Sequence, residues 1–445
     1  MSGNFYELLH ERWVGRLDGA AMRTPGVPVI TYQELDERSA QMAGAVSGLG
    51  VTVGDRVAAQ VDKSVDAVAL YLACLRAGAV FLPLNTAYTD AEVQFFIRDA
   101  EPALVVARPG TLADLGAQVV TMDRDGGDSL QDIANRAEPM VEVVERDGDD
   151  LAAMLYTSGT TGRSKGAMLT HSNLTSNALA LYESWRFTPD DVLLHTLPIF
   201  HAHGLFVALH CAWLGANEII FLPEFDVDAV VEHLPDATVM MGVPTHYVRL
   251  LTNPRFDPDT CRNIRLLTSG SAPMTAALHE EVTARTGHEI VERYGMTEAL
   301  MITSNPYDGA RVPGTVGMAL PGVEVRVTDE DGEIVPPEVS GGVEIRSTAL
   351  VTGYWRLPEK TASEFRDGGW FVTGDVGTLD EEGRLTLEGR AGDMIISGGY
   401  NVYPKEIEMV LDEVDGVDET AVIGVPHPDF GEAVVAVVVR DPGAR

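Results

Sequence analysis

A glycine-rich loop is the first segment whose residue types suggest chemistry. Residues 156–166 read YTSGTTGRSKG and follow a short apolar run that we interpret as a strand. Glycine lets the backbone approach a ligand closely, hydroxyl and N–H groups donate to phosphate oxygens, and Lys165 adds a positive charge. The spacing differs from a Walker A loop, because Gly159 and Gly162 are only three residues apart. From composition alone, a phosphate-binding loop and an ordinary surface loop both remain open.

Carboxylates and histidines in later segments also have types suited to chemistry. Glu298 is a single carboxylate, which is adequate for a hard cation that is shared with phosphates. The alternative is a solvated glutamate at the start of a helix, where its charge suits the helix dipole. Asp375 follows a glycine, and an ionised carboxylate suits a pair of neighbouring hydroxyls because it only accepts hydrogen bonds. A turn aspartate would have the same surroundings. His201 and His203 are two residues apart and do not share a helical face, which disfavours a zinc site, and we expect His203 to have a structural role.

Alternating strands and helices must position these residues. Continuous apolar runs separated by amphipathic segments predict a parallel sheet covered on both faces, and therefore an α/β fold. Helical spacing is expected at 65–76 and 90–99. The expected strands are 56–61, 80–83, 103–106, 151–156, 192–197, 218–222, 238–243, 264–268 and 289–292.

The pattern changes after about residue 313. Strands at 323–328, 342–347 and 384–388 are punctuated by Asp331-Gly332 and Glu382-Gly383, which predicts antiparallel hairpins. From Gly389 a new unit begins with a turn, an apolar strand, a glycine loop and a helix starting near Pro404. It ends with a strand at 433–439.

Length and charge exclude several classes of protein. At 445 residues the chain is long enough for two or three cores. Its formal charge of −35 makes nucleic-acid and membrane-surface partners unfavourable. The three cysteines are far apart and indicate free thiols of a reducing compartment. With no signal-like start and no apolar run of about 20 residues, the sequence predicts a cytoplasmic protein. The sequence does not predict an oligomeric state.

Six segments in order resemble the motifs of the adenylate-forming superfamily, which includes acyl-CoA synthetases, luciferases and adenylation domains. Within it the chain looks most like the malonyl-CoA synthetases. The segments cover most of the chain: TSGTTGRSKG (157–166), PIFHAHG (198–204), SGSAPM (269–274), ERYGMTE (292–298), TGD (373–375) and EGRAGDMIISGGYNVYPKEIE (388–408).

The resemblance implies a two-domain ligase. A large N-terminal domain of layered α/β sheets, with a β-barrel-like part from about 313, would span residues 1–390. A small α+β lid would begin at 391 and continue to 445. The implied reaction joins a carboxylate to ATP with Mg²⁺, giving an acyl-adenylate, and then transfers the acyl group to coenzyme A. Positioning and charge neutralisation dominate such phosphoryl chemistry.

The resemblance also assigns the nucleotide site. Glu298 would hold Mg²⁺ together with Thr157, and Thr297 would contact phosphate. Asp375 would accept the ribose hydroxyls, with Arg390 beside it. The remaining expected ATP or AMP residues are Ser158, Gly159, Thr160, Thr161, Gly162, Lys165, Ser271, Ala272, Glu292, Tyr294, Gly295 and Met296.

Arg293 is the residue that indicates which carboxylic acid is the substrate. The resemblance places it in the acyl pocket, where many relatives carry a small residue, with Ser271 in the wall and His201 near the acyl carboxylate. A buried guanidinium is costly unless the substrate brings an anion, and its planar fork matches a carboxylate. We therefore expect a short dicarboxylate, malonate or methylmalonate. The alternative is that Arg293 faces solvent or phosphate.

The end of the chain departs from the family pattern. Gly392 stands at the expected hinge, where relatives usually carry Asp or Lys, and glycine accepts large backbone changes. Residues Ser397, Gly398, Gly399 and Tyr400 would form the loop for the thiol step. The family's C-terminal lysine matches none of Lys63, Lys165, Lys360 and Lys405, so we expect the natural protein to be longer.

Two other functions remain open from the sequence. The chain could be a ligase for another short or aromatic acid, because only Arg293 and the pocket shape favour a diacid. It could also be a non-catalytic nucleotide-binding remnant that keeps the phosphate loop and Asp375. Pyrophosphate release and a screen of acids would separate these possibilities.

Overall fold

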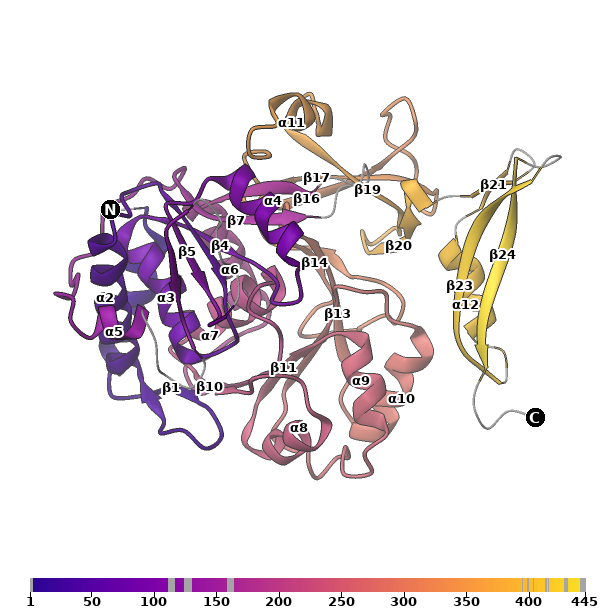
Figure 1. The fold of residues 1–445 in the computed structure, drawn as a ribbon. Helices are drawn as coiled ribbons and strands as arrows, with labels where there is room; N and C mark the ends of the chain where they lie inside the picture. The colour runs from indigo at the N-terminus through magenta and orange to yellow at the C-terminus, as the bar shows by residue number, and fades with distance from the viewer. Residues whose placement is uncertain are drawn as a thin grey trace.

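The computed structural model describes residues 3–110, 117–123, 130–157, 164–393, 395–397, 400–402, 404–412, 414, 416–427 and 431–440. These residues form four β-sheets with helices packed between and around them (Figure 1). The α/β fold expected from the sequence, with a large N-terminal part and a small C-terminal unit, is confirmed. Among the described residues, no helix is both long and apolar enough to cross a bilayer.

A six-stranded sheet carries the phosphate loop at one edge. Its order is β6-β5-β3-β4-β7-β8, and all neighbouring strands are parallel except the antiparallel β7–β8 pair. The expected helices are confirmed as α3 (Val65–Ala77) and α4 (Asp90–Ala100). The strands are β3 (Arg56–Gln60), β4 (Val80–Pro83), β5 (Leu104–Ala107), β6 (Val119–Thr121), β7 (Leu151–Thr157) and β8 (Lys165–Thr170).

A nine-stranded sheet carries the motifs at 198–204, 269–274 and 292–298. Its order is β15-β14-β13-β12-β11-β9-β10-β1-β2, and the run from β13 to β1 is parallel. Each of these three motifs follows or lies within a strand of this sheet. The strands are β1 (Ala20–Arg23), β2 (Ile30–Thr31), β9 (Val192–His195), β10 (Glu218–Phe221), β11 (Val239–Gly242), β12 (Leu266–Ser269), β13 (Ile290–Met296), β14 (Leu300–Ser304) and β15 (Met318–Ala319).

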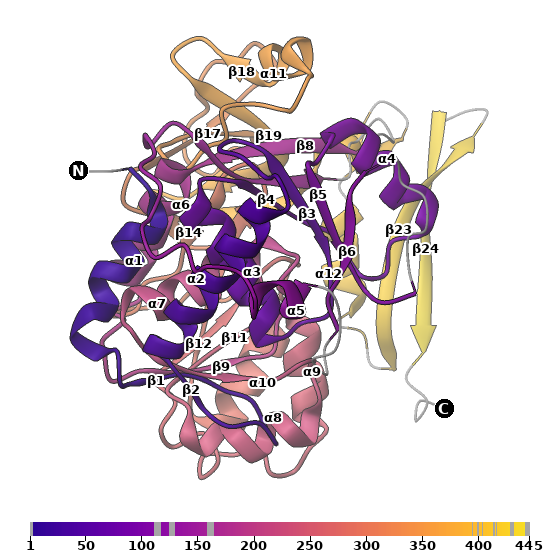
Figure 2. The same cartoon turned by 60° about the vertical axis from the view of Figure 1, so that its left-hand side comes forward.

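Helices cover both faces of the nine-stranded sheet. Leu193 joins the core cluster that reaches the six-stranded sheet, whereas Leu194 joins the cluster under the outer helices. This explains the continuous apolar runs. The outer helices are α8 (Val227–His233), α9 (Pro244–Leu251) and α10 (Ala276–Thr286), at the lower side of Figure 2. The others include α1 (Phe5–Trp13), α2 (Tyr32–Gly48), α5 (Leu130–Ala134), α6 (His171–Ser184) and α7 (His210–Leu214).

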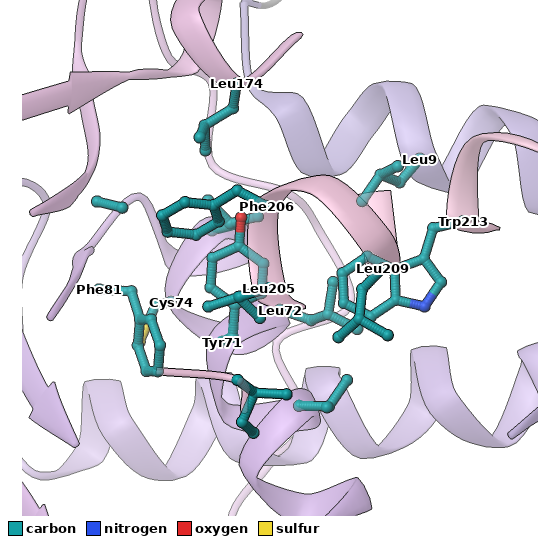
Figure 3. Packing of buried hydrophobic residues seen from close by; sticks show 14 of the residues in the cluster. Leu9, Tyr71, Leu72, Cys74, Phe81, Leu174, Leu205, Phe206, Leu209 and Trp213 are labelled. Carbon is teal, nitrogen blue, oxygen red and sulfur yellow. The ribbon is translucent and has the colours of Figure 1, made fainter. Parts of the chain in front are cut away.

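A buried π-helix, η2 (His203–Leu209), links the main core to the histidine motif. Phe206 packs with its ring centroid 5.7 Å from that of Tyr71, and Leu205 and Leu209 lie in the same cluster (Figure 3). Because η2 begins at His203, the packing of these apolar residues fixes where that histidine lies.

Replacing Phe206 with alanine should destabilise the protein by about 3–5 kcal/mol, because Phe206 is fully buried and its removal leaves a cavity. Urea unfolding would measure the change in free energy. Val248→Ala is the control: Val248 is 53% exposed, so a change within about 0.5 kcal/mol is expected. A loss below about 1 kcal/mol in Phe206→Ala would contradict the importance of this packing.

An antiparallel sheet follows, formed by β16 (Val323–Thr328), β17 (Gly341–Ser347), β19 (Trp370–Leu379), β18 (Phe365–Arg366) and β20 (Leu385–Arg390). The two predicted hairpins are confirmed: Gly332 and Gly383 both have φ of 84°, as such turns require. The strand β19, which carries Asp375, was not expected from the sequence. Helix α11 (Pro358–Glu364) precedes β18.

Residues just before α11 add an edge to the six-stranded sheet. The Met168 N–H donates to the Gly353 carbonyl at 3.1 Å, and the Trp355 N–H donates to the Gly166 carbonyl at 2.8 Å. We call residues 352–355 the edge segment. It fixes β8 at the point where the chain leaves the phosphate loop.

The C-terminal unit stands apart from the rest in Figure 1 and connects through a short 3₁₀ turn (Ala391–Asp393). Its helix is α12 (Pro404–Asp412), which packs on β23 and also contacts β20. The sheet has the antiparallel order β22-β21-β24-β23, with β21 (Ile395–Ser397), β22 (Tyr400–Val402), β23 (Val417–His427) and β24 (Gly431–Arg440).

Candidate active site

Arg293 is a buried cation for which the described residues supply no counter-ion. It lies on β13, is 2% exposed, and none of its three guanidinium nitrogens has a hydrogen-bond partner among the described residues. Burial lowers its pKa to about 9, and Tyr247 opposes this shift. A Cβ on Gly270 would lie 2.6 Å from the Arg293 Cζ, so the guanidinium lies directly against that glycine. The solvent-facing alternative for Arg293 is therefore wrong.

His203 lies beside this cation. Its Nδ1 is 3.3 Å from the Ser271 Oγ, and its Nε2 has no partner among the described residues. Burial lowers the pKa of His203 well below its ordinary value, and the positive charge of Arg293 lowers it further. The imidazole is therefore neutral at neutral pH. The sequence had assigned His203 a structural role, so its place next to Arg293 is a finding of the structure.

His201 and Ser271 lie at the solvent side of the same region. His201 is exposed, two residues before His203, with its ring 4.6 Å from that of Phe200. Ser271 follows β12 and has φ of 67°, an uncommon conformation for a residue other than glycine. Such strain is often found where a binding site needs a particular backbone direction. The structure thus brings Ser271 to His203, whose pKa the charge of Arg293 lowers.

Glu298 lies in the turn between β13 and β14 and is only 7% exposed. It does not lie at a helix start, so the alternative of a solvated helix-cap carboxylate is wrong. Its Oε1 accepts from the Tyr354 hydroxyl at 3.0 Å and from the Thr157 Oγ at 3.4 Å. Thr157 is the last residue of β7, and its hydrogen bond to Glu298 shows that these two residues are in contact. The described residues contain no cluster of three or more histidine, cysteine or acidic side chains that could hold a metal.

Lys165 begins β8 and is largely buried. Its Nζ lies 3.2 Å from the Glu364 Oε1 and 4.4 Å from the centre of the Tyr354 ring. The ammonium of Lys165, at the end of the phosphate loop, is thus held by the carboxylate of Glu364. Of the loop itself, Ser158, Gly159, Thr160, Thr161 and Gly162 lie outside the described residues.

Asp375 lies among the side chains that the sequence placed near the ribose. Its carboxylate accepts a short hydrogen bond from the Tyr294 hydroxyl and lies 3.1 Å from the Arg390 Nε. Its own N–H donates to the Thr373 Oγ at 3.0 Å. The bond to Tyr294 orients the carboxylate, and a bulge after Tyr294 in the β13–β14 pairing re-aims this strand at the site.

The remaining expected residues of the nucleotide site line the same edge. Glu292 is 5% exposed, and burial raises its pKa to about 8. The Gly314 N–H donates to the Glu292 Oε1 at 3.3 Å, which opposes the rise in pKa. A Cβ on Gly295 would lie 2.1 Å from the Leu300 carbonyl oxygen, so only glycine fits there. Met296 ends β13, Thr297 begins the turn to Glu298, and Ala272 follows Ser271.

The expected thiol-step residues belong to the C-terminal unit. Gly392 is exposed within the 3₁₀ turn that joins β20 to β21. Ser397 and Tyr400 face each other across the β21–β22 pairing. Gly398 and Gly399 lie outside the described residues.

Four site residues were missed from the sequence: His203, Gly270, Tyr354 and Glu364. Gly270 could have been found, because it stands in the SGSAPM motif. Tyr354 and Glu364 carry no motif signal, and only the fold brings them to Glu298 and Lys165.

Comparisons with known proteins identify one enzyme family over most of the chain. The model of the AMP-binding enzyme family matches residues 15–355, and that of the AMP-binding enzyme C-terminal domain matches residues 406–445. The mitochondrial malonate–CoA ligase ACSF3 of Mus musculus is 38% identical, over 93% of this chain and 78% of the relative.

Solved structures give the same result. ATP-bound MatB from Rhodopseudomonas palustris is 53% identical with a TM-score of 0.97, over 100% of this chain and 90% of that one. A benzoate CoA ligase from Burkholderia xenovorans LB400 has a TM-score of 0.89 at 28% identity, over 99% of this chain and 90% of that one.

Proposed function

The chain belongs to the AMP-binding enzyme family and is an AMP-forming acid–thiol ligase, and we propose that its acid is malonate and its thiol coenzyme A. The reaction would first form malonyl-AMP and pyrophosphate from malonate and ATP. The thiol of coenzyme A would then displace AMP. Relatives named as malonate–CoA ligases support this proposal.

The buried Arg293 is the observation that supports malonate as the substrate acid. A guanidinium that is 2% exposed and has no hydrogen-bond partner within the described part of the chain is costly to bury, and an anion on the substrate would offset that cost. The groups that act electrostatically on the adjacent His203 are themselves cationic or neutral: Arg293, His195, His246 and His201. In a chain of net charge −35, this is a local site of the opposite sign. One carboxylate would bind Arg293 while the other reacts.

The nucleotide side would be held by the remaining motif residues. Lys165, Thr297 and the phosphate loop would neutralise the triphosphate, and Asp375 would accept from the ribose hydroxyls beside Arg390. Ser271, Ala272 and Tyr294 would line the adenine, and His201 would lie near the reacting carboxylate. Bringing two anions together needs orientation and charge neutralisation, which these side chains supply.

The residues around Glu298 fit Mg²⁺. Oxygen donors at a single buried carboxylate suit a cation that usually takes one or two protein carboxylates and completes its shell with phosphates and water. Glu298 and Thr157 would hold the ion, which would neutralise charge on the phosphates when bound. Tyr354 orients Glu298 by donating to it at 3.0 Å.

The C-terminal unit would serve the thiol step. We place the domain boundary at 390/391, with Gly392 as the hinge, because this turn joins the unit to β20. Rotation there would bring the loop of Ser397 and Tyr400 to the acyl-adenylate. Glycine at this position permits the backbone change that such a rotation needs.

A substrate screen tests the proposal directly. The purified protein is supplied with ATP, Mg²⁺ and coenzyme A, and pyrophosphate and acyl-CoA are measured with malonate, methylmalonate, succinate, propionate and acetate. We expect malonate to give a kcat/KM at least about 10³-fold above propionate, because the unpaired Arg293 rejects the monoacid. Equal rates with propionate would identify a ligase for another acid. ATP binding without pyrophosphate release from any acid would identify a non-catalytic binder.

A further inference from the structure

Two carboxylates, one phenol and two ammonium groups form a connected cluster at the start of β8. Tyr354 is 2% exposed and its hydroxyl contacts the Glu298 Oε1 at 3.0 Å and the Glu364 Oε2 at 2.7 Å. The other oxygen of Glu364 binds Lys165 at 3.2 Å and Lys360 at 2.5 Å. Glu298, the expected metal ligand, and Lys165 are thus joined through Tyr354 and Glu364.

Local structure fixes the phenol and the glutamate relative to each other. The Tyr354 N–H donates to the Thr361 Oγ at 2.9 Å, which ties the edge segment to α11. A Cβ on Gly353 would lie 2.6 Å from the Thr361 Cγ2, so the two segments touch closely. Glu364 ends α11 on the same side. Neither side chain can shift without moving backbone that also holds β8.

The charges of the cluster favour a positioning role over a purely structural one. The Tyr354 hydroxyl has one proton to donate, and a carboxylate oxygen of Glu298 and one of Glu364 both lie within hydrogen-bond distance of it. Lys360 gives Glu364 a second cation four residues away on α11. Glu364 therefore remains compensated when the ammonium of Lys165 contacts a phosphate.

We propose that Glu364 is a positioning residue for Mg·ATP: it holds the Lys165 ammonium directly and the Glu298 carboxylate through the Tyr354 hydroxyl. This inference rests on the proposed function for the roles of Lys165 and Glu298. Removal of partners that orient a metal-ligating carboxylate typically weakens metal binding or activity by about 10–100-fold.

The test is a double-mutant cycle on nucleotide binding. Tyr354→Phe, Glu364→Ala and the double variant are titrated with Mg·ATP by calorimetry in the absence of any acid. Each single change should raise Kd about 10-fold. Because Tyr354 and Glu364 share the link to Glu298, the double variant should lose clearly less than the product of the two single losses, which is about 100-fold. Glu359→Ala, an exposed glutamate on the same helix, should bind like the wild type.

A second readout separates positioning from folding. The loss in Tyr354→Phe should disappear when ATP is titrated without Mg²⁺, because the phenol acts on Glu298, and a general loss of structure would persist. If Glu364→Ala melts below the assay temperature, Glu364→Gln takes its place in the cycle, with a smaller rise in Kd because glutamine keeps an acceptor oxygen and loses only the charge. Single changes within twofold of wild type, or effects that multiply in the double variant, would overturn the proposal. Since no acid is present, failure of malonate as a substrate would not alter these results.

Discussion

Replacing Arg293 with methionine should remove the preference for malonate over propionate. The two acids differ in one carboxylate, which we expect to bind the guanidinium, and methionine keeps the length of the side chain without its charge. A site built to bind a charged group rejects analogues that lack it by up to about 10⁴-fold, so the ratio of kcat/KM values should fall by about 10³–10⁴. Propionate should be used as well as or better than by the wild type, because no unpaired cation remains buried. Initial rates of pyrophosphate release with each acid measure this.

Two comparisons make the Arg293 result specific. Gly270→Ala places a Cβ 2.6 Å from the Arg293 Cζ, so it should displace the guanidinium and lower malonate use without removing the charge. Arg356→Met is the matched control: that arginine is half-exposed and pairs with Glu101 at the surface. An Arg293→Met enzyme that still prefers malonate would show that another group selects the acid.

Replacing Glu298 with glutamine should lower kcat by about 10²–10³-fold, because a metal ion contributes several kcal/mol of charge stabilisation in phosphoryl transfer and glutamine cannot supply the anionic ligand. Glutamine keeps an oxygen that can accept from Tyr354, so the fold around it should persist. Unlike Arg293→Met, this change should affect every acid equally. Rates measured over a range of Mg²⁺ concentrations would report both the lower kcat and the weaker binding of Mg²⁺.

Glu344→Gln is not a suitable control for this experiment, because that buried glutamate binds two arginines in the antiparallel sheet. Glu359→Gln is suitable, since Glu359 is exposed on α11. If Glu298→Gln keeps the wild-type kcat and Mg²⁺ dependence, the metal is held elsewhere.

The sequence predicted the strands well where both faces are covered, because burial on two faces leaves a continuous apolar run. β4 was predicted with its observed bounds, and β3 and β5 within one residue at each end. β19 was missed because it reads WFVTGDVGTL, in which polar residues and glycines interrupt the apolar pattern. Its pairing with β17 and β20, not its own propensity, makes it a strand.

The candidate site divides in the same way. Motif residues such as Thr157, Glu298 and Asp375 could be named from local sequence, and the structure brings Thr157 to Glu298 and Arg390 to Asp375. That the described residues leave Arg293 unpaired could not be read from the sequence, because it depends on which side chains the fold places around the guanidinium. Tyr354 and Glu364 reach the site only through the tertiary contact of the edge segment.

That edge segment has a consequence for biosynthesis. Its hydrogen bonds to Gly166 and Met168 join parts of the chain that leave the ribosome far apart in time. Until residue 355 emerges, β8 is an unprotected outer strand, open to pairing with other nascent chains. Nucleotide affinity should consequently arise late in translation, when closure of this long loop has been achieved.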